Sequence, residues 1–86
     1  MKHFTCPSFW DSYYNLPISI QQIADKNFKL LKVDTKHPSL HLKRVSKDLW
    51  SVRVGTGYRA LAIPLQDGNL AWFWIGTHRE YEKLIK

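Results

Sequence analysis

Residues 70–75 read Leu-Ala-Trp-Phe-Trp-Ile, and this unbroken apolar run constrains the fold more than any other segment. Successive side chains of a strand point to opposite faces, so a strand here is apolar on both faces. Such a strand has to lie inside a sheet that is covered at least partly on both sides. The run is also far too short to span a bilayer, so we expect no membrane association.

Four strands are predicted in the second half of the chain. They comprise residues 40–45, 49–54, 58–65 and 70–75. The tripeptide Asp67-Gly68-Asn69 is a strong hairpin signal between the last two strands. A further short strand at residues 2–5 would make a fifth. Strands joined by such short turns predict an antiparallel sheet.

Helices are predicted before and after these strands. Pro7 suits the first turn of a short helix that ends before Pro17. Pro17 begins a second helix, whose apolar residues recur at helical spacing at Ile20, Ile23, Ala24, Phe28 and Leu31. Thr77 and Glu80 form a capping box at the start of a helix over residues 78–85. The predicted fold class is α+β: an N-terminal helical hairpin packed on a four-stranded, or five-stranded, antiparallel sheet, with a short C-terminal helix.

The length, the cysteine content and the charge of the chain limit which functions are possible. The 86 residues predict one domain over residues 1–86 with a small core. The single cysteine, Cys6, excludes an internal disulfide and fits the reducing cytoplasm, and residues 1–15 lack the apolar run of a signal peptide. The net charge is +6, and residues 35–59 carry six basic residues against Asp48 alone. Such concentration is typical of proteins that bind a polyanion, although a solvated lysine surface would give the same count.

Arg53 and Arg59 lie on two predicted strands joined by Gly55-Thr56-Gly57. If these three residues form the turn, the arginines oppose each other on one sheet face; a two-residue turn would put them on opposite faces. Directly opposed like charges destabilise a sheet, and an anion bound between the two guanidinium groups would remove that conflict. Local pairing with carboxylates is the alternative, but Asp48 is the only one nearby and cannot neutralise both.

His78 and Tyr81 open the C-terminal helix, and their spacing of three places them on one side of it. The first turn of a helix also offers free backbone N–H groups to a phosphate. Imidazole and phenol can transfer protons, so together with the two arginines they favour RNA chemistry. Tyr81 could instead only anchor the apolar edge of the helix, and His78 could be a surface residue.

Further basic residues are candidates for RNA contacts: Lys43, Arg44, Lys47 and Arg79. The first three could equally be edge charges that block unwanted strand pairing. No metal and no other cofactor is expected. His3 and Cys6 form only half of a metal site, and Pro38 disfavours the helix that would align His37 with His41.

The strings RVGTGYRAL and WFWIGTHREYEKL, with the D-G turn between them, resemble the RelE/ParE superfamily of toxins from bacterial toxin–antitoxin pairs. The strings SFWDSYYNLP, ISIQQIA and HPSLHLK also fit, so the resemblance covers nearly the whole chain. It implies a small microbial RNase fold of a helical hairpin, an antiparallel sheet and a final helix. It also implies one of two activities: RelE-like members cleave mRNA in the ribosomal A site, whereas ParE-like members poison DNA gyrase.

The resemblance favours the RelE-like activity, because the two strand arginines, His78 and Tyr81 stand where RelE-like toxins carry catalytic groups. It implies a ribosome-dependent, metal-independent mRNA endoribonuclease in which His78 or Tyr81 is the base and the arginines stabilise the phosphate charge. The lysines of RelE have no clear counterpart unless Lys43 or Lys47 fills the role. The alternatives are a gyrase poison and a non-catalytic, antitoxin-bound regulator. Each implies a cognate antitoxin, acidic and partly disordered, that covers the basic face.

Overall fold

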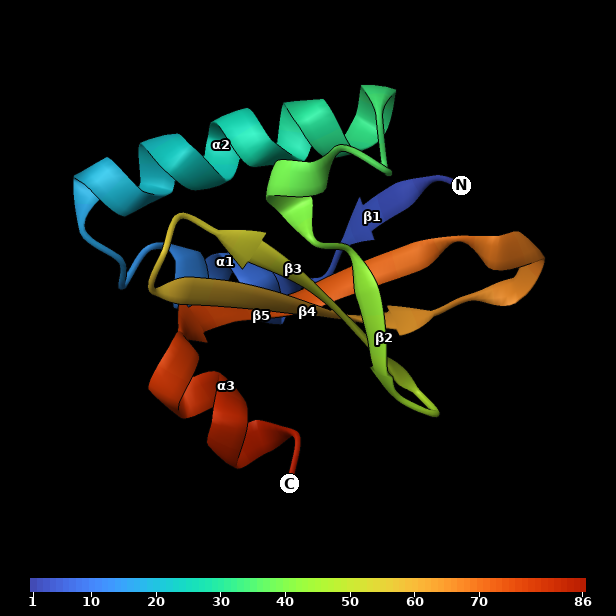
Figure 1. The fold of residues 1–86 in the computed structure, drawn as a ribbon. Helices are drawn as coiled ribbons and strands as arrows, with labels where there is room; N and C mark the ends of the chain where they lie inside the picture. Colours follow the sequence, from blue (N-terminus) through green and yellow to red (C-terminus); the bar gives the residue numbers. More distant parts are fainter.

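The computed structural model describes residues 1–86 and is built around one five-stranded sheet with helices on both sides (Figure 1). In chain order the elements are β1 (His3–Thr5), α1 (Pro7–Tyr13), α2 (Ile18–Val33), η1 (Pro38–Leu40), β2 (Lys43–Ser46), β3 (Leu49–Val54), β4 (Tyr58–Pro64), η2 (Gln66–Gly68), β5 (Leu70–Thr77) and α3 (His78–Leu84). Both η elements are single turns of 3₁₀ helix. The strand order is β1-β5-β4-β3-β2. None of the helices combines the length and the apolar content needed to cross a lipid bilayer.

The predicted α+β class is confirmed, and the short strand near the N-terminus is present. The expectation of a wholly antiparallel sheet is wrong, because β1 pairs parallel to β5, with Phe4 opposite Ala71. The hairpin-connected strands β2 to β5 are antiparallel, as short turns require. No such turn joins β1 to β5. Its direction is therefore set by how the N-terminal segment enters the fold, which a three-residue pattern does not reveal.

The main core lies between one face of the sheet and the helices α1 and α2. Its buried members are Phe9, Tyr13, Ala24, Leu31, Leu40, Val52, Val54, Ala60, Ala62, Leu70, Trp72 and Ile75. α2 packs over β3, and α1 lies along β5. Burial of the large aromatic rings supplies much of the hydrophobic stabilisation that so short a chain can gather.

A bulge in β5 divides its side chains between the two faces in an unexpected way. Leu61 pairs with Trp74 and Ala62 with Trp72, so Phe73 is an extra residue without a partner on β4. The bulge returns Ile75 to the main core and places Trp74 on the opposite face. Simple alternation through residues 70–75 would have placed Trp74 beside Trp72.

The face of the sheet away from the main core is covered by α3, which contacts β4 and β5. Tyr81 of α3 and Leu61 of β4 are buried there, outside the main core. Figure 1 shows α2 and α3 on opposite sides of the sheet. Four of the candidate residues predicted from the sequence, Arg53, Arg59, His78 and Tyr81, lie on the α3 side.

β1 pairs with β5 only as far as Trp72, so the outer edge of the rest of β5 has no strand partner. Hydroxyl groups of α1 form hydrogen bonds with the backbone groups of that edge. Ser8 Oγ donates a hydrogen bond to the Phe73 carbonyl at 2.8 Å. Ser12 Oγ accepts one from the Ile75 N–H at 3.1 Å. A helix thus covers an edge that would otherwise be open to pairing with another chain.

Candidate active site

Arg53 and Arg59 stand directly opposite each other on β3 and β4. The register also pairs Val54 with Tyr58, which confirms the three-residue turn. Gly55 has φ +62°, a conformation that glycine adopts without steric penalty. Because Val52 and Val54 point into the main core, the two arginines project from the other face, the one that α3 covers. Arg53 and Arg59 are called the arginine pair below.

No carboxylate neutralises the arginine pair. Neither Asp48 nor any other acidic residue forms an ion pair with Arg53 or Arg59; the close contact of an acidic side chain that the structure contains is that of Glu82 with His78. Arg59 Nη1 donates to the Tyr58 carbonyl at 2.8 Å. Nε of Arg53 is buried without a hydrogen-bond partner. The pair therefore offers donors and positive charge that the chain itself does not satisfy.

The electrostatic conflict shows in Arg59. Burial lowers the pKa of its guanidinium, the charge of Arg53 lowers it further, and Tyr81 acts in the opposite direction. The group still carries its charge at neutral pH, because arginine starts from so high a value. An anion held between the two guanidinium groups would relieve the repulsion and supply the missing acceptors.

The start of α3 is fixed beside the arginine pair. The predicted capping box is present: Thr77 Oγ1 accepts from the Glu80 N–H at 3.1 Å, and Glu80 Oε1 accepts from the Thr77 N–H at 3.0 Å. The hydrogen bonds that the Thr77 N–H and the Thr77 hydroxyl donate to Glu80 Oε1, at 3.0 and 2.9 Å, lower the pKa of Glu80. The backbone N–H of His78 donates to the Gly57 carbonyl at 2.8 Å, which ties the helix to the β3–β4 turn. His78 is therefore held at a fixed place next to the strands that carry the arginines.

His78 and Tyr81 lie side by side, with ring centroids 5.5 Å apart. Tyr81 is only 5% exposed, because it lies between α3 and the sheet. His78 Nε2 lies 2.6 Å from a Glu82 carboxylate oxygen, and its Nδ1 is buried without a partner. Neither imidazole nitrogen is open to a substrate in this arrangement, so proton transfer by His78 requires the contact with Glu82 to open.

The other basic candidates divide into two groups. Lys43 pairs with Ser51 in the sheet and so shares the face of the arginine pair. Arg44 folds back on its own turn, donating to two carbonyl groups at 3.2 and 3.0 Å. Lys47 and Arg79 are exposed, and their side chains make no hydrogen bond or ion pair. The structure therefore brings Lys43 to the site, whereas the guanidinium of Arg44 is occupied elsewhere.

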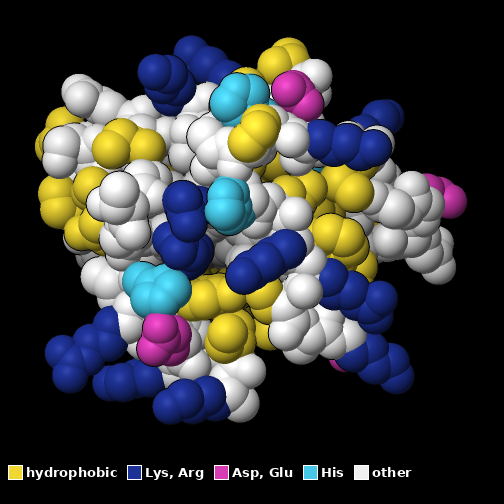
Figure 2. Space-filling view, in the orientation of Figure 1, with side chains coloured by type: hydrophobic (Ala, Val, Ile, Leu, Met, Phe, Trp, Pro, Cys, Tyr) yellow, Lys and Arg dark blue, Asp and Glu magenta, His cyan; other side chains and the backbone are white.

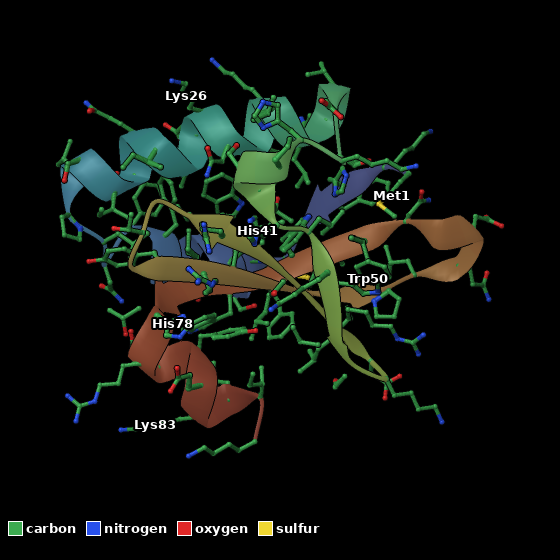
Figure 3. All side chains as sticks on the ribbon, in the orientation of Figure 1. Met1, Lys26, His41, Trp50, His78 and Lys83 are labelled. Atoms are coloured by element: carbon green, nitrogen blue, oxygen red, sulfur yellow. The ribbon has the colours of Figure 1, made fainter.

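His41 lies on this face but was not among the functional candidates predicted from the sequence. Figure 2 shows dark-blue basic side chains between the two histidines that Figure 3 labels His41 and His78. The signal was available, because counting back two residues from Lys43 along the strand returns to the same face. From the sequence, His41 was considered only together with His37 as a metal-ligand pair, which Pro38 disfavours.

The arrangement of an α1–α2 hairpin, a five-stranded sheet and a terminal helix is found in solved structures of small toxins. An archaeal RelE–RelB complex from Pyrococcus horikoshii OT3 matches with a TM-score of 0.65 and 12% identity, over 88% of this chain and 92% of that one. The isolated E. coli RelE toxin gives 0.63 and 12%, over 99% and 98%. A copper-bound mutant toxin from Helicobacter pylori gives 0.63 and 15%, over 93% and 97%. At these identities the likeness shows the fold alone.

The sequence itself makes the assignment more specific. The family model of the ParE-like toxin domain matches residues 18–83, and the chain belongs to this family. Among curated proteins no significant match is found. The predicted membership in the RelE/ParE superfamily is therefore confirmed.

Proposed function

We propose that this chain is the toxin of a toxin–antitoxin pair and that it cleaves mRNA in the ribosomal A site as a metal-independent endoribonuclease. The observation that carries the proposal is the arginine pair: two adjacent, partly buried guanidinium groups with no carboxylate partner, beside an imidazole and a phenol. A phosphodiester has the charge and the acceptor oxygens that this pair lacks. Residues 1–86 act as one toxin domain, in the cytoplasm where ribosomes are.

The reaction needs no added nucleophile, because RNA carries its own. The 2′-OH of a ribose gives its proton to His78 and attacks the adjacent phosphorus. The bond from phosphorus to the 5′-oxygen breaks, and a proton donor protonates that oxygen, which leaves a 2′,3′-cyclic phosphate and a 5′-hydroxyl. Arg53 and Arg59 stabilise the charge that builds on the two non-bridging oxygens. The negative charge of the RNA displaces Glu82 and frees the imidazole, while Tyr81 supports the ring from the sheet side.

Two kinds of partner fit the same face. Lys43, Lys47 and Arg79 would contact RNA phosphates around the scissile linkage, which predicts salt-sensitive binding. A cognate antitoxin with an acidic, partly disordered segment would cover the arginine pair and fold as it binds. The similar archaeal protein was solved as a RelE–RelB complex, which supports the expectation of a partner.

The test is induced expression followed by mapping of mRNA 5′ ends, with Arg59→Ala as the principal variant. Removal of one charge-stabilising donor commonly lowers the rate about 10²–10³-fold, so this variant should relieve growth arrest and abolish in-frame mRNA cuts. Lys26→Ala is the matched control, because it removes one positive charge from an exposed position on α2 (Figure 3). Thermal unfolding should show that both variants stay folded.

The competing activities give different results. Undiminished growth arrest by Arg59→Ala would count against the nuclease mechanism. Broken DNA with intact mRNA would indicate a gyrase poison of the ParE kind. A purified chain that does neither would be a regulator that acts only with its antitoxin.

A further inference from the structure

A row of three paired residues crosses the sheet on the α3 side. Arg53 pairs with Arg59, and Arg59 pairs with Gly76. β2 begins at Lys43 and runs antiparallel to β3, so His41, two residues earlier in the chain, lies toward the end of β3 that carries Arg53. His41 therefore lies beyond one end of the row, and Gly76 forms the other end.

The row has an imidazole at each end and the arginine pair between them. His78 follows Gly76 by two residues, at the first position of α3. His41 lies at the opposite end, just before β2. Figures 2 and 3 show the two histidines on the same face, with basic side chains between them.

The position of His41 is set by the segment before it. Leu40 is fully buried in the main core and anchors η1, which contacts β3. Within η1, His37 Nδ1 accepts from the Ser39 N–H at 3.3 Å, and the His41 N–H donates to the Pro38 carbonyl at 3.3 Å. An exposed side chain is thus carried by an anchored backbone.

His41 has a left-handed backbone conformation, with φ and ψ both +46°. Few residues other than glycine adopt it, although asparagine, aspartate and histidine are enriched among those that do, and such conformations concentrate at functional sites. The conformation turns the chain as it enters β2.

The two imidazoles differ in their availability. His78 is engaged by Glu82 through one nitrogen and buries the other. The His41 side chain is exposed and makes no hydrogen bond or ion pair. Basic side chains lie between His41 and His78 on this face, so an anion bound at the arginine pair would lie near a free imidazole.

We propose that His41 is a second catalytic residue, which donates a proton to the departing 5′-oxygen. This inference rests on the proposed nuclease function. The proton of the 2′-OH passes to His78 as the 2′-oxygen bonds to phosphorus. The bond to the 5′-oxygen breaks, and that oxygen takes the proton of His41. His41 ends neutral and His78 protonated, and exchange with water restores both.

His41 and His78 can act as acid and base because they lie at opposite ends of the row. The entering and leaving oxygens lie on opposite sides of the phosphorus during the displacement. A base and an acid are therefore needed on two sides of a phosphate whose other oxygens face the arginine pair. His41 and His78 satisfy that requirement, whereas His78 and Tyr81 lie on the same side.

The test uses the variant His41→Asn, because asparagine tolerates the left-handed conformation and cannot donate the proton. The probe is an mRNA with a single 5′-bridging phosphorothiolate at the codon in the A site of programmed ribosomes. A sulfur leaving group departs without protonation, so loss of a general acid should not slow it. We expect His41→Asn to lower the cleavage rate of the normal mRNA about 10²–10⁴-fold and that of the sulfur substrate less than about tenfold. Lys26→Ala should affect neither rate.

Equal slowing of both substrates would overturn the assignment, because it would mean that His41 only binds RNA. Unchanged cleavage of the normal mRNA by His41→Asn would also overturn it, while leaving the nuclease function intact. A wild-type chain that cleaves neither substrate would refute the nuclease function and this inference together. His41→Gly, which suits the same backbone, provides a second variant if His41→Asn does not fold.

Discussion

Gly76 is the position where one added methyl group should do most damage to the site. It lies in β5 opposite Arg59, and the indole of Trp74 passes over it. A Cβ built on Gly76 would lie 2.3 Å from Trp74 Cζ2 and 2.9 Å from Cη2. The same Cβ would be 3.0 Å from the Glu80 carboxylate oxygen that belongs to the capping box.

The magnitude follows from these distances. Carbon atoms pack at about 3.5–4.0 Å, so the indole has to retreat by roughly 1.2–1.7 Å in Gly76→Ala. Overpacking of this kind commonly costs about 1–3 kcal/mol of unfolding free energy. In a domain of 60–100 residues each kcal/mol shifts Tm by about 4–8 °C, so a cost of about 2 kcal/mol should lower Tm by roughly 8–16 °C. Displacement of Glu80 would also loosen the start of α3, and with it His78.

The assay is thermal unfolding followed by circular dichroism, with Gly57→Ala as the matched control. Gly57 has an ordinary backbone conformation and no atom within 4 Å of its added Cβ, so its substitution should be neutral or slightly stabilising. The double variant of Gly76→Ala with Trp74→Leu should recover part of the loss, because the clashing ring is gone. If the Tm of Gly76→Ala equals the Tm of Gly57→Ala, the steric reasoning is refuted.

Two further predictions concern α1. A hydrogen bond to Asp25 at 2.7 Å and then burial raise the pKa of Tyr13 to about 12, from 10.0. Folding therefore favours the protonated phenol, and its stabilising contribution should be complete below pH 10 and lost between pH 10 and 12. Urea unfolding across this range should show the loss in the wild type and not in Tyr13→Phe. Ser12→Ala should lower the free energy of unfolding, measured in urea, by about 1–3 kcal/mol, because it leaves an N–H of β5 unpaired. Ser19→Ala, at an exposed position of α2, should change the same free energy by less than about 0.5 kcal/mol.

The sequence predicted those features of the fold that depend on residues close together in the chain. The capping box of Thr77 and Glu80 places the start of α3 because it depends on two residues three apart. The opposition of Arg53 and Arg59 followed from the length of one turn. In each case the residues that determine the structure are close in sequence, so one sequence was enough.

Features that depend on distant packing were not accessible in the same way. The bulge at Phe73 is decided by how Trp72, Trp74 and Ile75 fill the two faces of the sheet, and a uniformly apolar run carries no sign of it. The parallel pairing of β1 depends on the route of the N-terminal segment. The left-handed conformation of His41 after η1 was not accessible either, because the pattern predicted a continuous strand from residue 40.

Under the proposed function, the arginine pair would link catalysis to inhibition. The chain has seven acidic residues, yet none forms an ion pair with Arg53 or Arg59. A partner that covers this face has to supply those carboxylates itself, or leave two buried charges unpaired at a considerable energetic penalty. The groups that would bind the RNA phosphate are therefore the groups that an acidic antitoxin would occupy. The unneutralised arginine pair therefore supports both parts of the proposal, cleavage of RNA and inhibition by an acidic partner.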